Sequence, residues 1–418
     1  MTMYPQRYKS HHDASSALKS GFEMQTDKKA YVARLLAGPA CTRRAIYIHV
    51  PFCTKVCSFC PFHRPDELSR QTYDKYVISE IDRLGGLPYM EAPVDSVYFG
   101  GGTPTALRPE QMSRILDRLK TTFDIPEGTE ISVETSVTEL SDEMTQALSE
   151  GGVNRLSVGV QTFDDGGRRL LGRRGSGEAA AERLRKTLKS GFKNVGIDLI
   201  YNYPGETEEI LARDIAIIRG LGLAGVSFYS LMLHEKTPIM KKISQADVGL
   251  MADTGRERVF FDMIADGLSG AGYEFFELTR MIRNGLDRYD YMRVRHSGGS
   301  CIAVGHGAGG NLDNYVYHNR HGGPLLGDDV PISAMGRVLG DGYFILDEFI
   351  NDLQKMAVDL SEYSGRLGFD LEERLSGVLE RATAGGLLER QGAGISLTRA
   401  GIFWGNNLID EFIREILK

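Results

Sequence analysis

The chain has 418 residues, of which 42% are hydrophobic and 25% are charged, a composition typical of a folded protein with two or three domains. A formal net charge of −7 gives no electrostatic case for a nucleic-acid partner. No apolar run reaches the length of a transmembrane helix, and the N-terminal residues lack an apolar secretion signal, so we expect a cytoplasmic protein without membrane insertion.

Apolar, β-branched runs alternate with helical patterns after a polar lead-in, residues 1–40, that contains one short predicted helix, Asp27–Leu36. The predicted strands are Ala45–Val50, Val94–Phe99, Glu130–Glu134, Arg155–Gln161, Asn194–Tyr201 and Gly225–Leu231. The predicted helices are Pro65–Leu84, Pro109–Phe123, Asp142–Ser149, Gly177–Ser190, Glu208–Arg219 and Asp253–Leu268.

Residues at the helix ends support this reading. Ser141 and Thr207 are candidate N-caps. The candidate C-terminal breakers are Gly151, Gly191 and Gly220. Strand-then-helix repetition predicts parallel strands joined by right-handed crossovers. We therefore expect an α/β fold with a partial (β/α)6 barrel over residues 41–270.

Two further regions follow the predicted barrel. Residues 271–340 are rich in glycine and are expected to be irregular. Residues 341–418 predict a small α+β module that resembles a winged helix. Its predicted elements are a helix at Asp370–Ala384, a hairpin through Gln391–Gly394 and a closing helix at Arg399–Leu417. Because its charges are mixed, we expect a packing or lid domain without a nucleic-acid role, with Trp404 in the core or in a substrate wall.

Three cysteines within eight residues are the strongest chemical signal: Cys53, Cys57 and Cys60, in YIHVPFCTKVCSFC. Three thiolates can hold a [4Fe–4S] cluster by three of its irons, which leaves the fourth iron open to a small ligand and to redox catalysis. A zinc site, with His49 or His63 as a further ligand, and a purely structural role are the alternatives.

Other polar or glycine-rich positions follow neighbouring predicted strands. The segment Gly100–Thr105 follows the second strand, and Glu134 ends the third. Gln161 ends the fourth, and Asp198 lies in the latter half of the fifth. Because ligands of such barrels bind at the C-terminal ends of the strands, we expect these residues and the cysteines to gather at one rim. Residues with structural roles alone would be scattered over both ends.

Four motifs in order resemble a known family. They are the segment from Tyr47 to Cys53, YFGGGTPT ending at Thr105, NRLSVGVQTF ending at Phe163 and DLIYNYPGET ending at Thr207. The cysteine spacing is similar to that of the radical S-adenosylmethionine (SAM) superfamily. The four motifs resemble its oxygen-independent coproporphyrinogen oxidases and their relatives. This resemblance implies an iron–sulfur cluster in place of zinc.

The resemblance also implies which residues contact SAM, which the open iron of the [4Fe–4S] cluster would bind. The implied contacts are Phe59, Gly101, Gly102, Thr103, Glu134, Gln161, Arg173 and Asp198. The glycines would let backbone approach the ligand, Glu134 would hold its ammonium or ribose hydroxyls, and Arg173 would suit its carboxylate. The structural alternatives are a buried, hydrogen-bonded Asp198 and a surface Arg173.

Members of the family use a second SAM. The resemblance implies Tyr47, Ser230 and Ala308 as its contacts, the last two by looser local similarity, and makes Tyr47 a catalytic candidate. His306, with His318 and His321 as alternatives, could ligate haem iron as a second catalytic candidate. A single histidine among glycines is more often a hydrogen-bonding loop residue.

Two segments favour one branch of the family. LTRAGIFWGNNL, residues 397–408, and GHGAGGNLDNY, residues 305–315, resemble the anaerobic haem-degrading radical methyltransferases, the anaerobilin synthase branch. Glu134 lacks the following proline that is usual in the decarboxylases, and Pro61 stands where many relatives have glycine, which puts the shape of the substrate-facing loop in doubt.

The resemblance therefore implies an enzyme that methylates and opens haem anaerobically and releases iron, by way of a 5′-deoxyadenosyl radical and a second SAM. The implied partners are haem or a related tetrapyrrole as substrate and a reducing electron donor such as flavodoxin or ferredoxin. The alternatives are a coproporphyrinogen decarboxylase, a haem-trafficking chaperone, and a radical methylase or cyclopropanase of a non-porphyrin metabolite.

Overall fold

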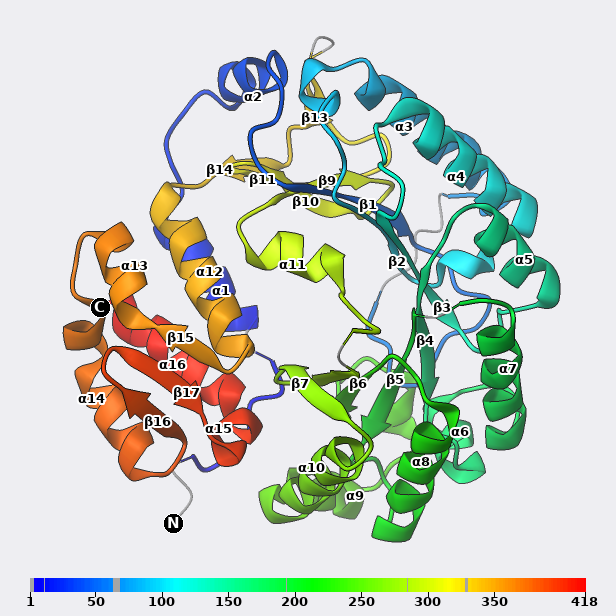
Figure 1. Ribbon diagram of the computed structural model, residues 1–418, viewed down its shortest axis with the longest axis vertical. Helices are drawn as coiled ribbons and strands as arrows, with labels where there is room; N and C mark the ends of the chain where they lie inside the picture. Colours follow the sequence, from blue (N-terminus) through cyan, green and yellow to red (C-terminus); the bar gives the residue numbers. More distant parts are fainter. Residues whose placement is uncertain (1–3, 11, 63–67, 193, 284, 328–329) are drawn as a thin grey trace.

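Six parallel strands form a curved wall in the computed structural model, which describes residues 4–10, 12–62, 68–192, 194–283, 285–327 and 330–418 (Figure 1). They are β1 (Arg44–Val50), β2 (Ser96–Gly101), β3 (Glu130–Ser136), β4 (Arg155–Gln161), β5 (Asn194–Tyr201) and β6 (Gly225–Ser230). They neighbour one another in sequence order, and almost all their residues are buried. The six predicted strands and the α/β class are confirmed, with ends that shift by two residues at most.

Helices cover the outer side of this wall (Figure 1). They are α3 (Tyr73–Gly85), α4 (Pro109–Thr122), α5 (Asp142–Glu150), α7 (Gly177–Lys189), α8 (Glu208–Leu221) and α10 (Thr254–Ser269). The side chains of Ser141 and Thr207 cap α5 and α8 as predicted. Gly220 lies inside α8, which instead ends at Gly222, because Gly222 adopts the left-handed conformation that stops a helix.

Among the α-helices of residues 41–270, two have no counterpart in the prediction, and one predicted helix is too long. The two are α6 (Asp165–Leu171) and α9 (Gln245–Ala252), each too short for a clear apolar period. The helix predicted at Pro65–Leu84 begins only at Tyr73, and Pro65 lies outside the described residues.

The expectation that residues 271–340 are irregular is wrong. They form α11 (Asp290–His296) and eight short strands. The strands are β7 (Tyr273–Glu277), β8 (Arg280–Arg283), β9 (Ser300–Val304), β10 (Gly309–Leu312), β11 (Tyr315–His318), β12 (Leu325–Gly327), β13 (Val330–Ser333) and β14 (Gly336–Val338). β9 pairs in parallel with β1, and the main sheet reaches twelve strands. α11 lies inside the curve of this sheet (Figure 1).

A separate C-terminal domain packs beside the open side of the wall (Figure 1). Its elements are α12 (Asp341–Gln354), β15 (Ala357–Asp359), α13 (Leu360–Leu367), α14 (Leu371–Ala384), β16 (Leu388–Gln391), β17 (Gly394–Leu397), α15 (Arg399–Phe403) and α16 (Gly405–Ile416). The predicted hairpin is β16–β17, which β15 extends to three strands. The single closing helix is instead broken at Trp404, whose ring is buried against Tyr4 and Phe403.

The N-terminal residues are more than a polar lead-in. α2 (Lys28–Leu36) matches the predicted helix, and α1 (His12–Gly21) precedes it. Arg7 is buried where the barrel meets the C-terminal domain: it donates to the Phe403 carbonyl at 2.6 Å and to Glu257 at 2.5 Å. This segment therefore ties the two domains together. Within the part of the chain that the structure describes, every helix is too short or too polar to span a bilayer.

Candidate functional site

The loop that carries the three cysteines follows β1 and is held by backbone hydrogen bonds on both sides. The Ser58 amide donates to the Leu171 carbonyl at 2.9 Å, and the Ser58 carbonyl accepts from Ile239 at 2.8 Å. On the other side, the Thr103 amide donates to the Phe52 carbonyl at 2.7 Å. The end of α6 and the segment after β2 thus fix the course of a loop that has no regular structure of its own.

The glycines after β2 make this contact possible. Gly101 has a φ of +110°, and a Cβ added there would lie 2.6 Å from the His49 ring. A Cβ at Gly102 would lie 2.5 Å from the Phe52 carbonyl oxygen. Glycine is therefore required at both positions for the packing of the cysteine loop against β2, in addition to any approach of a ligand.

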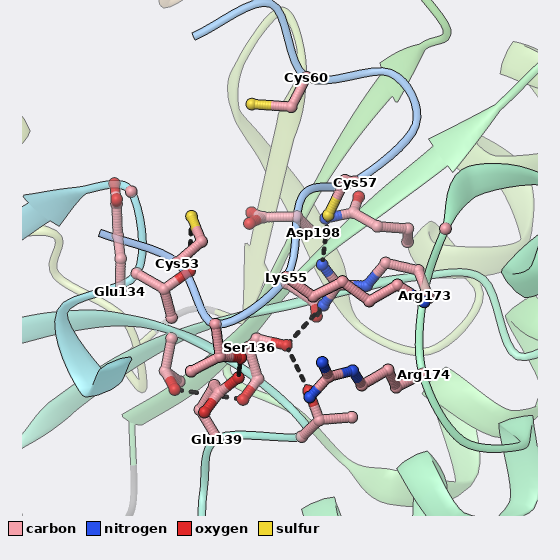
Figure 2. A pocket seen from close by; sticks show the side chains of 18 of the residues that line it. Cys53, Lys55, Cys57, Cys60, Glu134, Ser136, Glu139, Arg173, Arg174 and Asp198 are labelled. Atoms are coloured by element: carbon pink, nitrogen blue, oxygen red, sulfur yellow. Dashed lines mark hydrogen bonds between the residues drawn. The ribbon is translucent and has the colours of Figure 1, made fainter. Parts of the chain in front are cut away.

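A cavity of about 270 Å³, here called the cysteine cavity, opens at the C-terminal ends of β1 to β5 (Figure 2). Its lining includes every position predicted to bind the cluster or the first SAM, namely Cys53, Cys57, Cys60, Phe59, Gly101, Gly102, Thr103, Glu134, Gln161, Arg173 and Asp198. The structure therefore brings the predicted rim residues together at one end of the barrel.

The three thiols surround this cavity and do not converge on one point (Figure 2). Cys53 Sγ accepts from the Thr103 hydroxyl at 3.5 Å, and Cys57 Sγ accepts from Arg173 at 3.1 Å. Among the described residues, no three metal-ligating side chains are close enough to hold a single ion. Spread thiols fit a cluster that is held at three separate corners, whereas tetrahedral zinc needs donors around one centre.

The histidines of the zinc alternative give it no support. His49 Nδ1 is hydrogen-bonded to the Tyr47 hydroxyl at 2.9 Å, and His63 lies outside the described residues. Burial, with a contribution from nearby His306, lowers the pKa of His49 to about 4; this shift does not bear on zinc, which binds the neutral ring. His49 instead lines a second cavity, a position that the sequence analysis missed.

Two carboxyl groups face the cysteine cavity from β3 and β5. Glu134 accepts from the Tyr98 hydroxyl at 2.7 Å and from the Gly101 amide at 3.1 Å. Burial raises the pKa of Glu134 to about 7, against the opposing effect of the Tyr98 hydrogen bond. Burial also raises the pKa of Asp198, although Arg280 and Arg155 favour its charged form. Both carboxyls are thus suited to gain a cationic or hydrogen-bonding ligand.

Arg173 and Gln161 complete the opposite wall. Arg173 donates to the Ser136 hydroxyl at 2.8 Å and to the Gly159 carbonyl. Gln161 has a φ of +75°, and the pairing of β4 with β5 shifts register at this point. A left-handed backbone at a residue other than glycine is a strained conformation that concentrates at ligand sites.

A second cavity, of about 410 Å³ and here called the aromatic cavity, adjoins the first. It is lined by Tyr47, His49, Tyr98, Glu134, Tyr289, Tyr291, Met292, Arg295, Gly307 and Gly309. The rings of Tyr98 and Tyr291 stack with centroids 4.4 Å apart, and Tyr47 stacks on both at 6.2 Å. Glu134 lines both cavities, so their contents would lie side by side.

Several candidates for the second SAM or for haem ligation lie elsewhere. Ser230 and Ala308 are buried and line neither of these two cavities. His306 Nδ1 accepts from the His321 amide at 2.7 Å, and His306 lines neither cavity. An imidazole that accepts through Nδ1 carries its proton on Nε2, which does not suit iron ligation by that nitrogen. The hydrogen-bonding alternative for His306 therefore agrees better with the structure.

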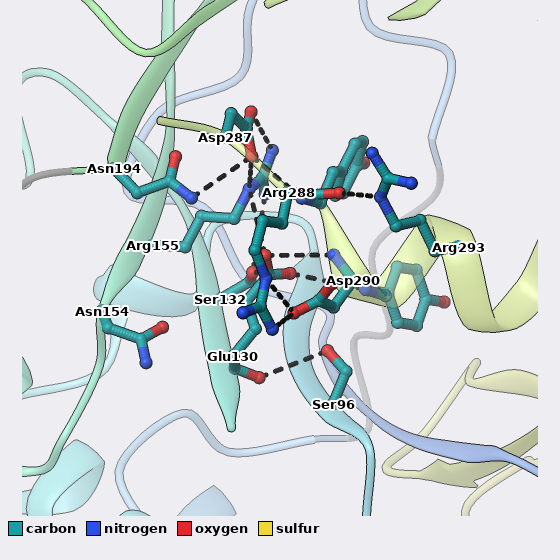
Figure 3. Close-up of polar contacts among 12 residues, drawn as sticks. Ser96, Glu130, Ser132, Asn154, Arg155, Asn194, Asp287, Arg288, Asp290 and Arg293 are labelled. Carbon is teal, nitrogen blue, oxygen red and sulfur yellow. Dashed lines mark hydrogen bonds and ion pairs between the residues drawn. The ribbon is translucent and has the colours of Figure 1, made fainter. Parts of the chain in front are cut away.

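A buried ionic network anchors α11, which carries the far wall of the aromatic cavity (Figure 3). Asp287 accepts from Arg155 at 2.9 Å and also from Arg280. The ring of Tyr289 lies between the two guanidinium groups, 3.8 Å from Arg155 and 4.6 Å from Arg280. Glu130 accepts from the Asp290 amide at the start of α11. No local sequence pattern marks this network, because Glu130 and Asp290 are 160 residues apart in the chain.

Two family models match the chain. The model of the Radical SAM superfamily matches residues 47–216, which include the cysteine loop and β1 to β5, and the model of the HemN C-terminal domain matches residues 344–404. With the barrel and the three cysteines, the first match defines a radical SAM protein.

Similar proteins indicate which radical SAM proteins this chain most resembles in sequence and fold. The chain is 27% identical to an anaerobilin synthase of Escherichia coli O157:H7, over 90% of this chain and 85% of that protein. It is also 27% identical to the heme chaperone HemW of Lactococcus lactis, over 88% and 97%. Its fold is similar to that of coproporphyrinogen III oxidase (HemN) from Escherichia coli, with a TM-score of 0.80, 22% identity, and 97% and 96% coverage. The chain thus contains a Radical SAM domain and a HemN C-terminal domain and is similar to HemN-like proteins over most of its length; a Radical SAM domain implies a [4Fe–4S] cluster and SAM.

Proposed function

We propose that the protein methylates and opens haem without oxygen and releases its iron. The observation that carries the proposal is the shared wall at Glu134, because it puts an aromatic cavity suited to a flat ring system directly beside the cysteine cavity. The similarity to an anaerobilin synthase and the segments 305–315 and 397–408 support the choice of reaction.

The cysteine cavity would hold the cofactors. Cys53, Cys57 and Cys60 would ligate the cluster, which supplies, when bound, the electron that starts radical chemistry on SAM. Arg173 would pair with the carboxylate of SAM, which its planar guanidinium fits, and Glu134 would accept from the ammonium or ribose hydroxyls. The remaining contacts would come from Phe59, Gly101, Gly102, Thr103, Gln161 and Asp198.

The aromatic cavity would hold the tetrapyrrole. The stacked rings of Tyr47, Tyr98 and Tyr291 offer an apolar surface against which a planar macrocycle gains contact area and loses water. A second SAM, whose methyl group would be transferred, would bind near Tyr47. Water exclusion at this position would protect reactive species from side reactions.

A haem-trafficking chaperone is the second candidate. The similarity to HemW has the same identity as that to anaerobilin synthase and covers 97% of the HemW chain. A chaperone would use the same aromatic cavity to bind haem but would return it unchanged.

One anaerobic assay separates the two candidates. The cluster-loaded protein is mixed with reductant, SAM and haem, and the haem spectrum, 5′-deoxyadenosine and tetrapyrrole masses are followed together. Loss of the haem spectrum with a methylated linear tetrapyrrole and free iron is the expected result. Formation of 5′-deoxyadenosine while haem stays intact would contradict the proposal, and stable haem binding without SAM consumption would support the chaperone.

A further inference from the structure

A third cavity, of about 190 Å³ and here called the outer cavity, meets the aromatic cavity at Arg295. It is lined by Lys19, Arg295, Gly298, Gly299, Gly309, Gly310, Asn311, Val316, His318, Tyr343, Phe344, Asp347 and Glu348. Arg295 and Gly309 are the residues common to both linings. The three cavities thus form a series, from the cysteines past Glu134 to the aromatic cavity and past Arg295 to the outer cavity.

We infer that Arg295 binds a carboxylate of the substrate at the junction of the aromatic and outer cavities. This inference rests on the proposed function, because it assigns the edge of a planar tetrapyrrole, where acidic side chains project, to a residue of this chain. Arg295 is a binding residue in this role and takes no part in the radical step.

The contacts of Arg295 distinguish it from two arginines that are buried in ion pairs. Arg7 pairs with Glu257 at 2.5 Å, and Arg155 pairs with Asp287 at 2.9 Å. Within the described part of the chain, no carboxylate lies within 4.0 Å of the Arg295 guanidinium, whose hydrogen bond to the Tyr291 hydroxyl is 3.5 Å long. Arg295 is exposed and lines both cavities, so its planar guanidinium is accessible to a carboxylate that a ligand would supply.

The acidic residues of the outer cavity do not take this place. Glu348 accepts from Arg366 at 2.6 Å. Asp347 accepts from Tyr343 and Asn351, both at 3.4 Å; burial raises its pKa, although Arg295 favours its charged form from beyond the 4.0 Å of an ion pair. Lys19 and His318 also line the outer cavity, so a carboxylate there would face basic groups as well.

The position of Arg295 matches the shape of the proposed ligand. Arg295 and Tyr291 lie one helical turn apart on α11, so the guanidinium stands beside the stacked rings of Tyr47, Tyr98 and Tyr291. A macrocycle against these rings would direct a peripheral carboxylate toward Arg295. The planar guanidinium of arginine binds a carboxylate through two parallel hydrogen bonds. Such a pair would fix the orientation of the macrocycle in the cavity and would also raise the affinity of the protein for it.

The test compares haem with haem dimethyl ester, in which both carboxylates are blocked. The cluster-loaded protein, in the presence of SAM, is titrated with haem and separately with the ester. The absorbance changes give the two dissociation constants. The wild-type protein should bind haem about 10- to 100-fold more tightly than the ester, the range expected for a charged hydrogen bond. Arg295→Gln should lower this ratio to near one, and Arg295→Lys should restore part of it.

Arg293→Gln is the matched control. Arg293 is on the same helix but lines neither cavity and donates to the Arg288 carbonyl (Figure 3), so its loss should leave the ratio unchanged. Equal affinities for haem and ester in the wild type, or an unchanged ratio in Arg295→Gln, would overturn the inference. If Arg295→Gln does not fold, the wild-type ratio and Arg295→Lys decide the question.

The two proposals can fail separately. Turnover of haem by a wild type that binds the ester equally well would contradict the role of Arg295 and leave the proposed reaction intact. Discrimination between haem and ester without turnover would support Arg295 and contradict the proposed reaction.

Discussion

Two parts of the main sheet differ in what they contribute. β1 to β5 and the loops that follow them carry the cysteines, the glycines and the carboxyl groups of the cysteine cavity. The later segment, β7 to β14 with α11, contributes none of that lining, but it extends the sheet and supplies Tyr289, Tyr291, Met292 and Arg295 to the aromatic cavity. In the proposed function, the first part would therefore provide the chemistry and the second part would enclose the substrate.

This division leads to an expectation about variants. Changes in the first part should stop SAM cleavage with any substrate, whereas changes in the second should alter stability or substrate binding before they affect SAM cleavage. Glu134 lies in both cavities and is the position where the two effects should be hardest to separate.

The largest effect is expected from Cys57→Ala. Removal of one of three ligands should reduce bound iron and sulfide and bring 5′-deoxyadenosine formation to the background level, while the melting temperature of the cluster-free protein stays unchanged. Cys41→Ala is the matched control, because Cys41 is exposed and remote from the cavities. Full turnover by Cys57→Ala would refute the cluster assignment.

Arg155→Met tests how far the buried network around Asp287 stabilises the second part of the sheet. Loss of one partner leaves Asp287 with less compensation, and breaking a buried pair typically costs about 3–5 kcal/mol of the free energy of unfolding. Arg118→Met removes an exposed ion pair with Asp82 and should cost about 0–1 kcal/mol. Urea unfolding measures both, and equal effects would show that the network does not stabilise this region.

The same comparison explains how much could be predicted from the sequence. Strands β1 to β6 are marked by continuous apolar runs, because both of their faces are buried, and the motifs at their ends gave the rim residues. β9 to β11 are only four or five residues long, and β10 begins with two glycines, so their pairing with β1 and with one another is what makes them strands.

Other parts of the site had no local signal. The network around Asp287 joins residues far apart in the chain, and the left-handed backbone of Gln161 depends on a register shift between two strands. The stacked tyrosines belong to three separate elements, β1, β2 and α11, which only the fold brings together. The candidates taken from loose similarity, Ser230 and Ala308, line neither cavity, and neither does His306.

Gly102→Ala tests the close packing of the cysteine loop against the segment after β2. The new Cβ would lie 2.5 Å from the Phe52 carbonyl oxygen, so the loop must shift, at a cost of about 1–3 kcal/mol for such overpacking. The cluster content of the purified protein should also fall. Gly86→Ala, at a position with nothing within 4 Å of the added atom, should change neither stability nor cluster content.

The smallest effect is expected from Glu134→Gln, and its sign depends on pH. The pKa of this carboxyl is raised by burial from 4.5 to about 7, so the folded protein keeps a proton that the unfolded chain has already lost in this range. The stability that the neutral carboxyl contributes is complete below about pH 4.5 and declines as the pH rises to 7.

Because glutamine resembles the neutral acid, the free energy of unfolding of the SAM-free variant should match that of the wild type at pH 5 and exceed it at pH 8 by on the order of 1 kcal/mol. SAM should reverse this order at pH 8, since a bound cation or hydroxyl donor gains from the charged carboxylate and not from the amide. Thermal melts at both pH values, with and without SAM and with the exposed Glu127→Gln as control, measure the difference. A variant that is no more stable than the wild type at pH 8 would show that Glu134 already has a compensating partner in the SAM-free protein.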